Sequence, residues 1–84
     1  MGRTVPTYSQ VLDKEVRKWR EFYNALRRKD REIFDKVIEL AKMNRDAGSQ
    51  MRTPEPFKPM ILSILLEQQK ELASLRKELE KLKD

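Results

Sequence analysis

The sequence predicts an all-α protein of three helices, over residues 8–28, 30–47 and 59–83, the last forming a parallel coiled coil. Three observations support this fold class. Apolar residues recur at helical spacing, no helix breaker follows Pro59, and leucines repeat without a break near the carboxyl end. Because apolar residues make up 38% and charged residues 39% of this short chain, we expect one small domain with a modest core that self-associates.

The first helix has a well-defined predicted start. Residues 1–7 form an extended arm, because Pro6 lacks an amide proton and disfavours helical angles in the residue before it. Thr7 and Gln10 match a capping box, in which each side chain satisfies a free backbone N–H of the first turn. The apolar stripe that follows indicates a helix with one buried face and comprises Leu12, Val16, Trp19, Tyr23 and Leu26.

The second helix is expected to start at Asp30, a good N-cap, and to stop at Gly48, which supplies a left-handed residue after the last turn. Residues 27–29 contain neither Gly nor Pro, so the junction with the first helix is either a tight corner or a kink in one long helix. Residues 8–47 thus form a helical pair with a basic surface.

A proline-rich linker is predicted over residues 48–58, where Pro54 and Pro56 favour an extended polyproline conformation. Pro59 suits the first turn of the last helix, and no helix breaker follows it. Residues 59–84 therefore form one long helix with a coiled-coil end.

The last helix carries an unbroken four-three alternation, the a and d pattern of a coiled coil. In this register Glu71 and Glu78 take g positions and Arg76 and Lys83 take e positions, so opposite charges face each other only in a parallel pair. We therefore expect a homo-oligomer and favour a parallel dimer, while leucine at both a and d leaves trimers and tetramers open. The alternative is that this stripe closes a monomeric bundle against the first helix. The residues of this predicted oligomerisation seam are Ile61, Leu65, Gln68, Leu72, Leu75, Leu79 and Leu82.

Positive charge is concentrated in the first half of the chain. Residues 14–31 hold eight basic and three acidic side chains, which accounts for the whole net charge of +5. Such a cluster is typical of a surface that binds phosphates, so DNA or RNA is the expected partner. A solvated or protein-facing surface is the alternative. The candidate nucleic-acid-binding residues, including one in the arm, are Arg3, Lys14, Arg17, Lys18, Arg20, Arg27, Arg28, Lys29 and Arg31. The helical spacing of Trp19, Phe22 and Tyr23 favours core packing over base stacking.

The composition removes most catalytic chemistry. The chain has no Cys and no His, so disulfides, thiolate nucleophiles, imidazole bases and the usual zinc sites are excluded. We expect no enzymatic activity, no cofactor and no metal. The longest apolar stretch, residues 60–66, is too short to cross a bilayer, and the polar start does not resemble a secretory leader. A cytoplasmic protein with no membrane partner is the expectation.

Several short segments carry a family resemblance. They are Gly2-Arg3-Thr4-Val5-Pro6-Thr7-Tyr8, Trp19, Ala25-Leu26-Arg27-Arg28, Phe34-Asp35, and Pro56 before the leucine-rich helix with Glu67-Gln68. Over nearly the whole chain this pattern resembles a family of small, uncharacterised archaeal proteins that opens with Gly-Arg-Thr-x-Pro-Thr. The resemblance implies an archaeal cytoplasmic origin and assigns no role to any residue.

The sequence therefore favours a non-enzymatic, self-associating helical protein that binds nucleic acid through phosphate contacts of its basic surface. The alternative is a protein-protein interaction adaptor, or a small subunit of a larger complex, without nucleic-acid binding.

Overall fold

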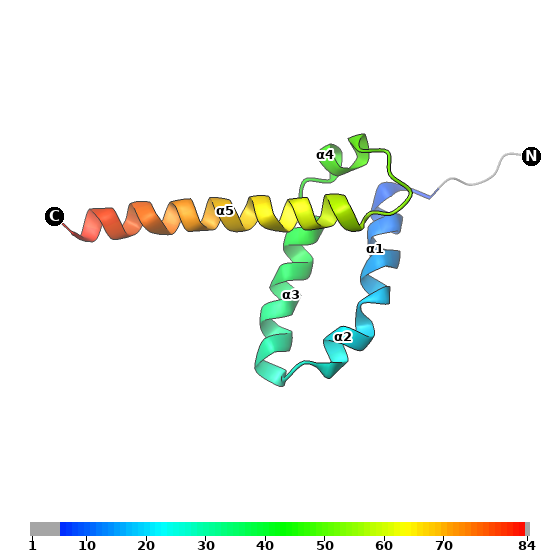
Figure 1. The fold of residues 1–84 in the computed structure, drawn as a ribbon, viewed down its shortest axis with the longest axis horizontal. Helices are drawn as coiled ribbons and strands as arrows, with labels where there is room; N and C mark the ends of the chain where they lie inside the picture. The colour runs from blue at the N-terminus through cyan, green and yellow to red at the C-terminus, as the bar shows by residue number, and fades with distance from the viewer. Residues whose placement is uncertain (1–5, 84) are drawn as a thin grey trace, which may run out of the picture.

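The computed structural model describes residues 6–83, so the predicted arm with Arg3 lies almost entirely outside the described residues. The described part of the chain is all-α, as predicted, but it forms five helices in place of the expected three. In Figure 1, α1 and α2 run down one side, α3 returns along the other, and α5 crosses the open end of this hairpin. The carboxyl-terminal half of α5 then extends well beyond α3. We call residues 6–56 together with the first turns of α5 the head, and residues 68–83 the tail.

The capping box is confirmed at the start of α1, Tyr8–Lys18. The Gln10 backbone N–H donates to Thr7 Oγ1 at 3.2 Å, and the Thr7 backbone N–H donates to Gln10 Oε1 at 2.9 Å. A single helix over residues 8–28 is wrong, however, because the chain breaks at Trp19 and continues as α2, Arg20–Ala25. Trp19 has ψ near 0°, and its backbone N–H donates to the Val16 carbonyl oxygen, three residues earlier, at 3.0 Å. The break turns the indole toward Phe34, with ring centroids 6.2 Å apart.

The junction between the first two predicted helices is a corner, not a kink. Leu26 and Arg27 both adopt extended angles, with ψ of 153°, and α3 begins immediately after them at Arg28 and ends at Lys42. The predicted N-cap is therefore wrong: Arg27 takes that place without a side-chain hydrogen bond, and Asp30 lies inside the first turn. There its negative charge still faces the positive end of the helix dipole.

The predicted second helix also ends too late, because the left-handed residue is Asn44 and not Gly48. Asn44 has φ 58° and ψ 38°, angles that asparagine adopts more readily than most residues. It separates α3 from the short α4, Arg45–Gln50, in which Gly48 is an internal, buried residue. Gly48 packs closely against Tyr8, because a Cβ atom there would contact the Tyr8 hydroxyl and lie 3.0 Å from Tyr8 Cζ, so the Tyr8 side chain would have to shift.

The linker is shorter than the predicted 48–58, because α4 and α5 take residues from both of its ends. The last helix, α5, spans Phe57–Leu82 with Pro56 as its N-cap residue, so it starts two residues before the predicted Pro59. Pro59 lies within the first turn. Backbone N–H groups there have no intrahelical acceptor, so a proline, which has no N–H, costs no hydrogen bond.

The core lies where α5 crosses the hairpin. It is small, as the composition predicts, and consists of Leu12, Leu40, Ala41, Met60 and Ile64. Half-buried Val16, Trp19 and Val37 pack around it. Lys42 Nζ lies 3.0 Å from Asp13 Oδ1, and this contact ties α3 to α1 and lowers the pKa of the Asp13 carboxyl. Head packing therefore uses the first three turns of α5 and leaves the tail exposed.

Candidate functional site

Most of the predicted oligomerisation seam is exposed in the single chain. Leu65, Leu72, Leu75 and Leu79 keep 50–59% of their surface accessible, and Leu82 keeps 81%. Gln68, the polar member, is exposed as well. Ile61 differs, because it is half-buried and packs against the core of its own chain. The structure thus places the seam on an open face of the helix, with its first residue at the edge of the head.

The helix α5 carries two separate stripes. The side chains buried within the chain are Met60, Ser63, Ile64 and Glu67. Seam residues such as Ile61 and Leu65 follow members of that stripe by one position, which rotates them by about 100° around the helix axis. Folding of the head consequently uses one face of α5 and leaves the adjacent apolar face without a cover.

A buried polar cluster fixes α5 to the end of α3. Ser63 Oγ donates to the Leu40 carbonyl at 2.7 Å and lies 2.8 Å from the Met43 carbonyl oxygen. Asn44 Nδ2 donates to Ser63 Oγ at 3.0 Å and to Glu67 Oε2 at 2.9 Å. The Asn44 hydrogen bond, and then Lys70 Nζ at 3.0 Å, hold the pKa of the Glu67 carboxyl below its ordinary value. Sequence reasoning missed this cluster, whose only local signal was polar residues on the inner stripe of an amphipathic helix.

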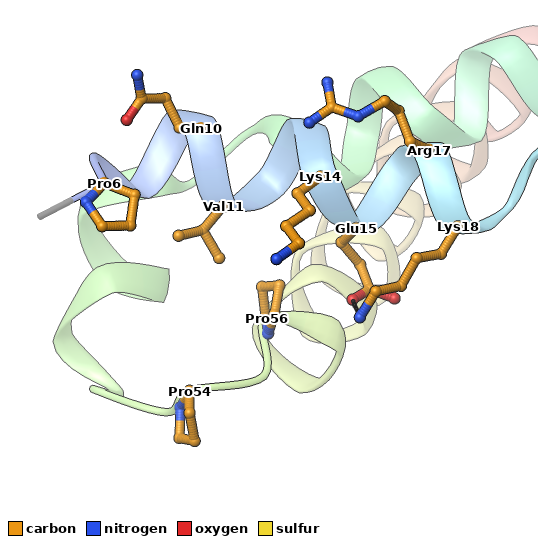
Figure 2. Close-up of a pocket in the computed structure, with 9 residues that line it drawn as sticks. All are labelled: Pro6, Gln10, Val11, Lys14, Glu15, Arg17, Lys18, Pro54 and Pro56. Carbon is orange, nitrogen blue, oxygen red and sulfur yellow. Dashed lines mark ion pairs between the residues drawn. The ribbon is translucent and has the colours of Figure 1, made fainter.

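The basic side chains extend from the second half of α1 through α2 to the corner before α3. Lys14, Arg17 and Lys18 lie on α1 and border a cavity of about 560 Å³ beside Pro54 and Pro56. Figure 2 shows the Lys14 ammonium directed toward Pro56 and the Arg17 guanidinium directed away from this loop. Lys18 turns to its own helix, where Nζ lies 3.6 Å from Glu15 Oε1.

Further basic side chains surround the corner between α2 and α3. Arg27, Arg28 and Lys29 are exposed there, and Arg20 is exposed at the start of α2. Arg31 has a structural role, since its Nη2 donates to the Asn24 carbonyl at 2.8 Å. The structure therefore distributes the predicted phosphate-binding residues over α1, α2 and the corner, with Arg17 and Arg20 bordering one hollow, and it removes Arg31 from the freely exposed set.

The aromatic residues of the hairpin pack against one another, but the core packing that their spacing predicts is wrong for Phe22. The Arg31 guanidinium carbon lies 5.9 Å from the ring centroid of Tyr23, and Tyr23 Oη donates to Asp35 Oδ2 at 3.3 Å. Burial, followed by this carboxylate, raises the pKa of the Tyr23 hydroxyl. Phe22 lies 5.4 Å from Phe34 by ring centroids, yet 59% of Phe22 remains exposed.

Phe22 borders an apolar hollow of about 350 Å³ between the hairpin and α5. We call it the aromatic hollow, and it is lined by Trp19, Phe22, Phe34, Val37, Phe57, Ile61 and Ile64. The helical spacing of the hairpin aromatics favours core packing over base stacking and does not predict an open hollow. The signal that could have revealed the hollow was the pair Phe57 and Ile64, which take the g positions that glutamates occupy further along the helix.

Comparison with known proteins identifies a family. The chain belongs to the DUF8156 family. The family model, described as a domain of unknown function, matches residues 1–84. No curated protein and no solved structure matches this DUF8156 chain significantly. Among residues 6–83, no helix is long and apolar enough to span a membrane, and acidic side chains form no group of three suited to hold a metal ion.

Proposed function

We propose that this chain is a non-enzymatic protein that pairs in parallel through α5 and presents two basic heads to the phosphate backbone of nucleic acid. The observation that carries the proposal is the row of exposed leucines along α5, from Leu65 to Leu82. A monomer that exposes such a stripe along a projecting helix has an unsatisfied apolar surface, and a second copy of the same stripe satisfies it.

The flanking charges favour the parallel arrangement. In the seam register, Glu71 faces Arg76 of the second copy and Glu78 faces Lys83 of the second copy. All four side chains are exposed in the single chain and are available for such contacts. Each surface pair contributes only about 0.5 kcal/mol, so the charges select the orientation while leucine burial stabilises the pair.

Sedimentation velocity over a concentration series tests the pairing. We expect the wild type to reach twice the 10.1 kDa mass of one chain at micromolar concentration. Leu75→Asp places a charge in the seam and should remain monomeric. The matched control is Leu66→Asp, because Leu66 is 48% exposed on the same helix but lies outside the seam. A wild type that stays monomeric at high micromolar concentration would contradict the proposal.

An engineered cysteine tests the orientation. The chain contains no Cys, so a single Leu82→Cys variant reports one contact only. In a parallel pair the two position-82 side chains meet at a d layer, and mild oxidation should give a covalent dimer. An antiparallel pair places them at opposite ends of the assembly, so a dimer that fails to cross-link excludes the parallel arrangement.

The phosphate-binding half of the proposal rests on the exposed basic corner. We expect binding to duplex or single-stranded nucleic acid whose log affinity falls linearly with log salt concentration. Reversal of Arg27, Arg28 and Lys29 to Glu should weaken binding and reduce the salt slope by roughly one for each phosphate that the corner no longer neutralises. Reversal of Lys58, Lys77 and Lys81 changes the net charge equally and is the control. Equal binding by the two triple variants would refute the assignment to the corner.

A protein adaptor is the second candidate function. It is favoured by apolar side chains that are exposed away from the seam, among them Ile33 at 65% and Met43 at 46%. An adaptor would form a stoichiometric protein complex that survives nuclease and high salt, and it would not bind nucleic acid in the salt series. These two measurements therefore separate the candidates.

A further inference from the structure

The aromatic hollow and the seam share Ile61 of α5. Its α5 wall is formed by Phe57, Ile61 and Ile64. These residues are spaced by four and three positions, so they lie along one face of the helix. Ile61 belongs both to this wall and to the seam, which makes the hollow continuous with the exposed leucines that follow.

The far wall of the hollow consists of aromatic rings from the hairpin. Trp19 contacts Phe34 and Phe57 edge-on, with centroid distances of 6.2 and 6.3 Å. Phe22 and Phe57 remain 59% and 49% exposed. A large exposed apolar surface beside a leucine stripe is typical of a site that another apolar surface covers.

We infer that the first half of α5 from a second copy of this chain covers the aromatic hollow, so that the interface extends from the tails into the heads. This inference rests on the proposed parallel pairing. In paired helices the axes lie about 8–10 Å apart, so the second α5 would run directly alongside the hollow wall. The same contact that closes the leucine seam thereby closes the hollow.

The register supplies the covering side chain. In a parallel pair each g residue faces the e residue five positions later on the second copy, and this rule gives opposite charges in the tail. Applied to the first turns of α5, it places Phe57 opposite Leu62 of the second copy. Leu62 is 55% exposed in the single chain and has no role in the core. The g–e pairs thus change from charged in the tail, through Ile64 with Gln69, to apolar at Phe57 with Leu62, which favours a second copy as the occupant.

The test uses Trp19, the single tryptophan of the chain and a wall of the hollow. Acrylamide quenching of its fluorescence is measured across the concentration range in which sedimentation shows monomer and dimer. We expect the quenching constant to fall by roughly twofold or more on dimerisation, since the second copy shields the indole. A dimer in which Trp19 is quenched as readily as in the monomer overturns the inference and leaves the pairing of the tails intact.

Leu62→Asp is the decisive variant, with Leu66→Asp as its control. Both positions are exposed on the same helix, at 55% and 48%, so neither substitution disturbs the core. Leu62→Asp should raise the dimer dissociation constant roughly tenfold or more and leave Trp19 open to acrylamide, while Leu66→Asp should match the wild type. Equal dissociation constants for the two variants overturn the inference. A wild type that never dimerises refutes the proposed pairing, and this inference falls with it.

Discussion

Replacement of Asn44 by alanine is the sharpest test of how the head holds α5. The substitution has two effects. The Asn44 amide donates to Ser63 Oγ at 3.0 Å and to Glu67 Oε2 at 2.9 Å, and hydrogen bonds of this kind contribute about 1 kcal/mol each. Alanine must also keep a φ of 58°, which adds at least about 1 kcal/mol of backbone strain. We therefore expect Asn44→Ala to reduce the free energy of unfolding by about 3 kcal/mol.

The comparison with Asn44→Gly separates the two contributions. Glycine accepts the left-handed angles without strain but cannot replace the amide, so it should reduce stability by about 2 kcal/mol. Urea denaturation followed by helical circular dichroism gives both values. The measurements are made in a Leu75→Asp background, so that unfolding is not linked to association. If Asn44→Ala changes the unfolding free energy by less than about 0.5 kcal/mol, the buried polar cluster does not hold α5 to the head.

Two further predictions concern groups inside the head. Hydrogen bonds lower the pKa of Glu67 below its ordinary 4.5, so its stabilising effect is fully present above that pH and is lost as the pH falls through the folded-state pKa. The melting-temperature difference between wild type and Glu67→Gln should therefore shrink from pH 7 to pH 3, and a constant difference would contradict this account. Gly48→Ala should destabilise by about 1–3 kcal/mol, because its new Cβ meets the Tyr8 ring. The exposed neighbour Gln50→Ala is the control, and equal melting temperatures would show that the ring moves aside freely.

The broad helical architecture could be predicted from local signals, whereas the breaks between helices could not. The capping box at Thr7 and the uninterrupted run of α5 depend on neighbouring residues alone. The breaks at Trp19 and Asn44 depend on contacts with distant helices, since the indole turns to reach Phe34 and the Asn44 amide turns to reach α5. Gly48 was misread for the same reason, because its role is to leave room for Tyr8 and not to end a helix.

The candidate surfaces show the same division. The apolar periodicity predicts the seam from Leu65 to Leu82. These leucines are exposed because α5 extends beyond the head. The basic residues are close in sequence, but the break at Trp19 and the corner at Leu26 distribute them over three helices. Arg31 is the clearest example, since only the folded corner places the Asn24 carbonyl within its reach.

Because of the projecting tail, the helical content of the chain should depend on its concentration. Residues 68–83 have no layer of the head behind them, and a free helical segment of about 15 residues is only marginally stable in water. Under the proposed pairing, ordering of the tail and association with a second copy form a single equilibrium. Dilution should unwind the end of α5 as well as separate the chains. The helical circular dichroism signal of the protein should therefore decrease as its concentration falls.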